Sequence, residues 1–176
     1  MVTMRHIPAL LVAVACLGCE AVGPQVDDLP LSPAFAMGPI VHQATLGGAD
    51  VCEALGLPTG CDANFSLVAN QYADGSVAGQ WQDSFRTVEG QIHVAVDCLA
   101  VHGNQAVVGG VITHATGAAD GSVGQRAITS VKDNGTSAND PPDQLSFSFF
   151  PVGVDCTIDP AVFPFVNLTN GQVRVW

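Results

Sequence analysis

The chain has 176 residues, a length typical of one domain, and 48% of these residues are hydrophobic while only 12% are charged. Its formal net charge of −11 comes from 16 acidic residues against five Lys and Arg, so its surface repels phosphate backbones and anionic lipid headgroups. We therefore expect no nucleic-acid partner. The low charge and the 19 glycines favour short strands joined by tight turns over long, salt-bridged helices.

Residues 1–18 are predicted to be an export signal. Arg5 supplies the positive charge at its start, and an uncharged, mostly apolar run from Ile7 to Gly18 follows. This run is too short to cross a bilayer of about 30 Å as a helix, but it suits the apolar region of a signal peptide. Pro8 within the run argues against a buried N-terminal helix.

The end of this run, Ala15-Cys16-Leu17-Gly18-Cys19, resembles the lipobox of bacterial lipoproteins. Neither cysteine has the leucine three positions upstream that this box prefers. Lipidation of Cys19 removes Cys16 with the signal and leaves an even set of four cysteines, whereas lipidation of Cys16 leaves Cys19 over. We favour Cys19, with Cys16 and simple secretion as the alternatives.

Residues 19–45 are predicted to form a flexible, lipid-anchored tether. Prolines interrupt any helix there, and Asp27 and Asp28 keep the segment solvated. A lipid on Cys19 followed by this spacer anchors the domain to a membrane. The expected location is the bacterial cell envelope, facing the periplasm or the exterior, and the alternative is a secreted protein.

Residues 46–176 are predicted to form the folded domain, because from Asn64 onward apolar and polar residues alternate as in half-buried antiparallel strands. The expected strands include 123–132, and strong turn signals separate several of them. The pattern predicts an all-β antiparallel meander of seven or eight strands that forms a small barrel, with a sandwich as the alternative. The residues expected on shared faces are Phe65, Leu67 and Ala69; Val77, Trp81 and Phe85; Ile92, Val94, Val96 and Cys98; Leu145, Phe147 and Phe149; and Val173 and Val175, and the turns are Asp74-Gly75, Gly103-Asn104 and Asp120-Gly121.

Four cysteines in this part, Cys52, Cys61, Cys98 and Cys156, are predicted to form two disulfides, and sequence leaves all three pairings open. The layout favours Cys52 with Cys61, which bracket a short segment rich in glycine and proline. Cys98, expected on the inward face of a central strand, would then bridge to Cys156 in the long connection after Phe150.

The folded part also resembles a loose group of exported bacterial domains that are often described as hypothetical proteins or lipoproteins. The resemblance spans about residues 60–176 and implies an exported β-domain without an assigned activity. Among the motifs that carry it are Val96-Asp97-Cys98-Leu99, Gly109-Gly110-Val111, Asp133-Asn134-Gly135 and Pro141-Pro142-Asp143-Gln144.

A first candidate site lies in the polar stretch 133–143. Asp133, Asp140 and Asp143 offer carboxylates and Asn134 offers a carbonyl, the hard oxygen ligands that Ca²⁺ prefers. The spacing differs from that of an EF-hand, and no Glu closes a cage. The alternative is a long surface loop held by Asx-turns and two prolines.

A second candidate site is a histidine pair. If Gly103-Asn104 is a two-residue turn, His102 pairs with Gln105, and counting back along the ladder places His93 opposite His114. Two facing imidazoles can hold a transition metal or act as a pH-sensitive pair. Asp97 is expected on the same face, whereas the alternative is a pair of solvated strand histidines.

Catalytic signatures are lacking, since the chain has no G-x-S-x-G elbow and no cysteine in an evident basic setting beside a histidine. We expect a non-catalytic envelope lipoprotein domain with an interaction or structural role, whose partner is an envelope protein. The alternative is a carrier that holds a small apolar ligand in the barrel, which requires an interior cavity. A metal-dependent hydrolase is ranked last because it needs three or more converging ligands.

Overall fold

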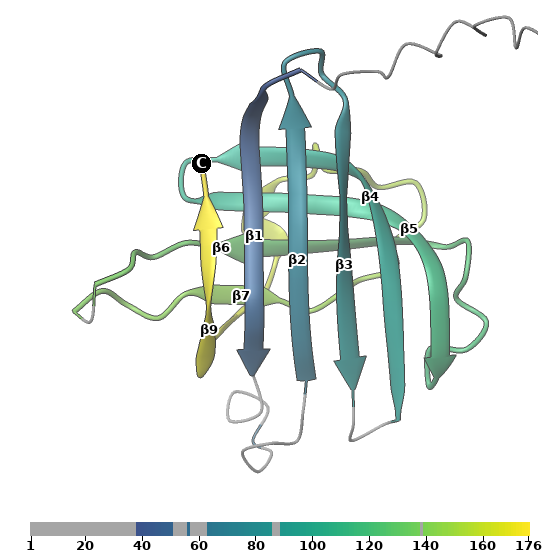
Figure 1. The fold of residues 1–176 in the computed structure, drawn as a ribbon. Helices are drawn as coiled ribbons and strands as arrows, with labels where there is room; N and C mark the ends of the chain where they lie inside the picture. The colour runs from purple at the N-terminus through teal and green to yellow at the C-terminus, as the bar shows by residue number, and fades with distance from the viewer. Residues whose placement is uncertain (1–37, 51–55, 57–62, 86–88, 138) are drawn as a thin grey trace, which may run out of the picture. The chain divides into compact units, whose positions relative to one another are not determined.

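The computed structural model describes residues 38–50, 56, 63–85, 89–137 and 139–176. These residues form an all-β structure in which antiparallel strands make one curled sheet with the form of a half-barrel (Figure 1). No helix within the described ranges is long and apolar enough to cross a membrane. The described elements are β1 (Ile40–Asp50), β2 (Ala63–Tyr72), β3 (Val77–Phe85), β4 (Gly90–His102), β5 (Gln105–Gly117), β6 (Arg126–Lys132), β7 (Gln144–Ser146), a 3₁₀ turn (Pro160–Val162), β8 (Phe165–Asn167) and β9 (Asn170–Val175).

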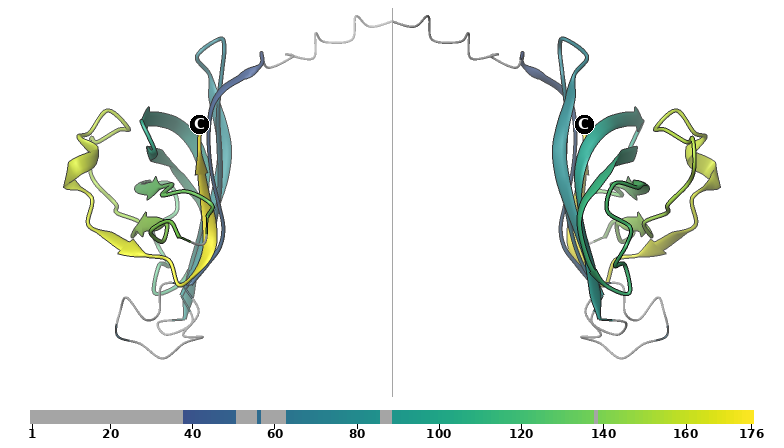
Figure 2. Two further views of the ribbon diagram at one scale, coloured as in Figure 1. Left: turned by 90° about the vertical axis from the view of Figure 1, so that its left-hand side faces the viewer. Right: turned by 90° about the vertical axis from the view of Figure 1, so that its right-hand side faces the viewer.

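The sheet curls because of where its last two strands lie. Its strand order is β8-β7-β6-β5-β4-β3-β2-β1-β9, so β8 and β9 occupy opposite edges. Yet Asn167 ends β8 and Asn170 begins β9, and a chain can cover at most about 11 Å over those three steps. The two edges must therefore approach each other, and the views in Figure 2 show the sheet bent around on itself.

The predicted all-β meander is confirmed, with nine described strands in place of seven or eight. The first strand begins at Ile40, so residues 40–45, predicted to be tether, belong to the sheet. Large apolar residues are few there, but Ala44 and Leu46 alternate with polar neighbours and are both buried against the inner core. The sixth strand begins at Arg126, after a turn that takes up the first residues of the expected strand 123–132.

The main core fills the inner face of the sheet. Phe65 and Trp81, cross-strand diagonal neighbours on β2 and β3, stack with ring centroids 6.4 Å apart. Val173 of β9 packs into the same cluster and is fully buried. Further members from β2, β4 and β5 are Leu67, Ala69, Ile92, Val94, Val96, Leu99, Ala106, Val108 and Ile112, most of which the alternation placed correctly.

A bulge in β4 inverts the strand's pattern at Asp97. Val96 pairs with Gly110 and Cys98 with Gly109, so Asp97 is an extra residue that has no partner of its own on β5. Beyond the bulge Leu99 faces the inner core, and Cys98 lies in a second cluster with Ile128 on the outer face. The prediction that Cys98 points inward is therefore wrong, because one inserted residue moves every following side chain to the other face.

The turn signals at Asp74-Gly75 and Gly103-Asn104 are confirmed. The Asp74 carboxylate accepts hydrogen bonds from the backbone N–H and the hydroxyl of Ser76, at 2.9 and 2.6 Å. Gly103 has φ +63°, which a glycine adopts without strain, and His102 pairs with Gln105 as the two-residue turn requires.

Candidate functional site

The segment between β7 and β8 passes to the outer face of β4–β6 after Ser148, and residues 149–164 are fixed to that face at several points. Phe149 pairs with Ile128 of β6 through both backbone groups, at 2.9 and 2.8 Å. Farther on, Gln105 of β5 donates from its side-chain amide to the carbonyl of Pro160 at 3.0 Å. We call residues 149–164 the outer connection. Its many anchors hold its side chains in defined positions on the sheet.

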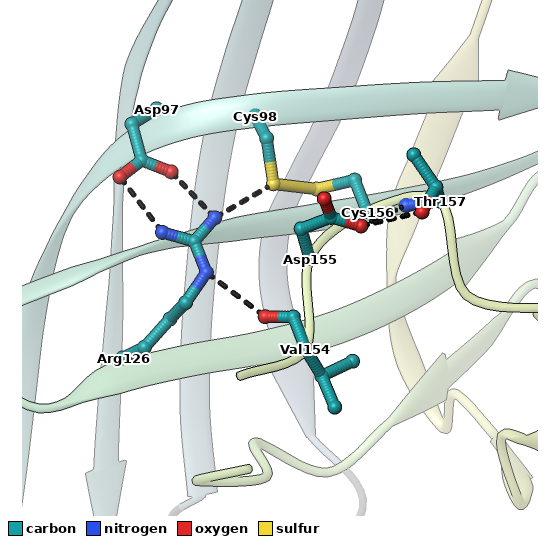
Figure 3. Close-up of a disulfide and its surroundings, with 7 residues drawn as sticks. All are labelled: Asp97, Cys98, Arg126, Val154, Asp155, Cys156 and Thr157. Carbon is teal, nitrogen blue, oxygen red and sulfur yellow. Dashed lines mark hydrogen bonds and ion pairs between the residues drawn. A yellow bond between two sulfur atoms is a disulfide. The ribbon is translucent and has the colours of Figure 1, made fainter. Parts of the chain in front are cut away.

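The disulfide between Cys98 and Cys156 is the covalent anchor of the outer connection, and it confirms this predicted pairing (Figure 3). Cys156 is 3% exposed and belongs to the outer cluster. The bridge lies over Gly109, where an added Cβ would come within 2.7 Å of the Cys98 sulfur and 3.2 Å of the Cys156 sulfur. Gly109 therefore leaves room for the disulfide on the sheet.

Arg126 forms a second anchor beside the disulfide (Figure 3). Its guanidinium binds the Asp97 carboxylate with both Nη atoms, at 2.7 and 2.9 Å, and its Nε donates to the carbonyl of Val154 at 3.1 Å. The hydrogen bonds with Asp97 raise the pKa of Arg126. Because the Asp97 side chain is 47% exposed, this ion pair contributes roughly 1 kcal/mol or less, and its main effect is to position the outer connection.

The outer connection exposes a group of large apolar side chains. Phe149 is 37% exposed, Phe150 46%, Val152 99% and Val162 58%. We call these four residues the apolar patch. Next to it lies a cavity of about 190 Å³ whose described lining is wholly apolar and includes Ile128, Phe149, Pro151, Ile158, Val162 and Phe163. The alternation predicted Leu145, Phe147 and Phe149 on one face, but Phe147 packs against the inner core and Phe149 lines the outer cavity. The rest of the segment was predicted only as a long connection, although the run Phe149-Phe150-Pro151-Val152 was the available signal for the patch.

Two carboxylates of the predicted calcium stretch bind the edge strand β9 from the connection between β6 and β7. Trp176 exchanges backbone hydrogen bonds with Gln43 of β1, so the N–H groups of Val173 and Val175 point away from β1. The Asp143 carboxylate accepts a hydrogen bond from the N–H of Val173 at 2.7 Å. The Asp133 carboxylate accepts one from the N–H of Val175 at 3.1 Å. These side chains take the place of a strand beside the free edge of β9.

The other oxygens of these residues are also engaged. Asp143 accepts from the backbone of Asn134 at 2.7 Å, and the Asn134 amide donates to the carbonyl of Pro142 at 2.7 Å. Asp140 accepts from the backbone of Ser137 at 2.8 Å. In the part of the chain that the structure describes, no group of three or more His, Cys, Asp or Glu side chains is placed to hold a metal ion. The arrangement thus resembles the Asx-turn loop that was the alternative.

The histidine pair lies where the ladder places it. His93 and His114 are direct partners on β4 and β5, and their ring centroids are 5.3 Å apart. Asp97, expected on the same face, binds Arg126. The other predicted site residues, the lipidation site Cys19 with its alternative Cys16 and the proposed partners Cys52 and Cys61, lie outside the described residues.

Asp83 is a buried acid that sequence analysis did not single out. It lies on the inner face of β3, paired with Phe65 and Ile92, and is 3% exposed. Ser148 donates a hydrogen bond to its carboxylate at 2.9 Å. Burial raises its pKa from 3.8 to about 7, which the hydrogen bond from Ser148 only partly offsets. Its burial could have been predicted from its position two residues after Trp81, since alternate residues of a strand share a face.

Comparison with protein-family models finds no match, and comparisons with curated proteins and with solved structures find none either.

Proposed function

We propose that this chain is a non-catalytic domain of the bacterial cell envelope, tethered by a lipid on Cys19, that binds a partner protein through the apolar patch. The observation that carries this proposal is the exposure of Phe150 and Val152 on a segment that is firmly held to the sheet. Exposed apolar side chains that gather in one place are typical of interaction sites. Because the outer connection is already ordered, little entropy is lost when it binds.

The export part of the proposal draws on two independent observations. Residues 1–19 have the sequence pattern of a lipoprotein signal. The disulfide between Cys98 and Cys156 belongs to an oxidising compartment, because cytosolic thiols are kept reduced.

The filled inner face favours an interaction role over the ligand-carrier alternative. Phe65, Leu67 and Trp81 occupy the inner face and are each no more than 3% exposed. The described apolar cavity of about 190 Å³ lies instead on the outer face, below the usual size of about 300–1,000 Å³ for small-molecule sites. A cavity of that volume suits one or two side chains of a docked protein segment.

Charge indicates the kind of partner. Asp155 and Asp159 lie on the outer connection, and the chain carries a formal net charge of −11. A cationic protein segment that also presents an apolar side chain complements both properties of this surface. An anionic membrane surface would match only the apolar patch, and the negative net charge of the chain would repel that membrane.

A photo-cross-linking residue at position 152 of the full chain, in its native cells, tests this function. We expect a specific protein adduct at position 152 and none at position 123, where Val123 is 56% exposed in the turn before β6. The purified adduct partner should bind Val152→Asn, which removes the apolar contact without adding charge, about tenfold or more weakly than the unchanged chain, and Val123→Asn equally well. Binding should also weaken with salt. Equal adducts at both positions, or adducts to lipid alone, would contradict the proposal.

A further inference from the structure

The register between β4 and β5 brings His93 and His114 together through two bulges that compensate each other. Asp97 is the extra residue on β4, and Thr113 is the extra residue on β5. Each bulge alone would shift the ladder by one residue and move one imidazole to the opposite face. With both present, His93 and His114 are direct partners, their ring centroids are 5.3 Å apart and their planes are inclined by 70°.

One nitrogen of this pair has no hydrogen-bond partner. Nε2 of His93 is buried and unpartnered, one of few such side-chain atoms in the described part of the chain. A buried imidazole nitrogen normally has a donor, an acceptor or a metal ion beside it. His114, by contrast, is exposed and leaves the pair accessible from solvent.

We propose that His93 and His114 together bind one divalent transition-metal ion of the Zn²⁺ class, a role separate from the proposed partner binding. Zinc binds imidazole nitrogens at about 2.0–2.1 Å, so two rings on one tetrahedral ion have centroids roughly 5 Å apart. The observed 5.3 Å agrees with that spacing. The 70° inclination makes this an edge-to-face contact, so the rings turn from this orientation when a nitrogen of each faces a common ion.

Space and further donors are present on the same side of the sheet. His93 borders a surface depression of about 410 Å³, which Ser66, Gln82 and Thr113 also line. Gln82 pairs directly with His93 across β3 and β4. Since no third His, Cys, Asp or Glu joins the pair among the described residues, water or a partner's side chain completes the coordination. Such an open site binds an ion more weakly than a closed structural site.

Isothermal titration calorimetry of the full chain with Zn²⁺ alone tests the proposal. We expect the site to bind one ion per chain, with at least about tenfold weaker binding in His93→Gln and in His114→Gln. His42→Gln and His102→Gln serve as matched controls, because both histidines are exposed on other parts of the sheet, and they should retain wild-type affinity. Thermal unfolding without metal checks that each variant is folded.

A second measurement separates coordination from a structural role of the histidines. Cu²⁺ binds the same nitrogen ligands more tightly than Zn²⁺, and its electron paramagnetic resonance spectrum resolves nitrogen coordination. We expect a spectrum that shows coordination by two nitrogens. His93→Gln and His114→Gln should each change it, and both control variants should leave it unchanged. Zn²⁺ affinity unchanged in both pair variants, or lost equally in His42→Gln, would overturn the proposal.

Discussion

Replacing Cys98 and Cys156 together by alanine should lower the free energy of unfolding by about 4 kcal/mol, because the disulfide joins residues separated by 58 positions and so restricts the unfolded chain. Chemical denaturation of the two proteins without reductant measures this difference. The double substitution is preferable to reductant, which would also break any bridge between Cys52 and Cys61. Equal denaturation midpoints in the variant and the unchanged chain would contradict the account.

The same variant links the disulfide to the proposed binding surface. Without the bridge, the outer connection is still held by the backbone pair of Phe149 with Ile128, and by single hydrogen bonds from Arg126 to Val154 and from Gln105 to Pro160. Those bonds are individually weak, so the apolar patch should become less ordered. We therefore expect the double variant to bind the cross-linked partner more weakly even where the domain remains folded.

Asp83 should make the domain less stable as the pH rises from about 4 to about 7. Its carboxyl ionises near 3.8 when the chain is unfolded, whereas burial keeps it protonated up to a pKa of about 7 in the folded domain. The unfolded chain thus releases the proton first, and the stability present below pH 4 is lost progressively until about pH 7. The full loss at pH 8 is on the order of 4 kcal/mol.

Asp83→Asn isolates this effect, since an amide stays neutral and its oxygen can still accept the hydrogen bond from Ser148. Denaturation at pH 4, 6 and 8 should find the variant increasingly stable relative to the unchanged chain. Asp120→Asn, in an exposed turn, is the matched control and should follow the unchanged chain. If the stability difference of Asp83→Asn is the same at all three pH values, the buried acid does not have the assigned role.

Local chemistry explains which parts of the fold the sequence predicted. Alternation identified the inner residues of β2 and β4, and Asp74-Gly75 and Gly103-Asn104 specified their turns, because these signals act within a few residues. The pairing of His93 with His114 was also predicted correctly. That result depended on two bulges that cancel, which no local pattern could reveal.

Long-range contacts explain what the sequence did not predict. Cys98 lies on the outer face and not the inner one because of a single bulge. The pairing of β9 with β1 depends on residues far apart along the chain. The roles of Asp133 and Asp143 could not be predicted either, because their carboxylate oxygens accept hydrogen bonds from backbone N–H groups of β9 more than twenty residues away. The apolar patch was overlooked because exposure depends on the whole fold and not on the run itself.

The central claim, an exported and lipid-tethered domain with a disulfide-held outer connection, is tested most directly by the intact mass of the mature protein from its native membrane, measured with and without reductant. We predict a chain that begins at Cys19 and carries a diacylglyceryl group, with Cys98 and Cys156 linked until reductant is added. A chain that retains residues 1–18, lacks lipid and has a free Cys98 thiol would contradict the account.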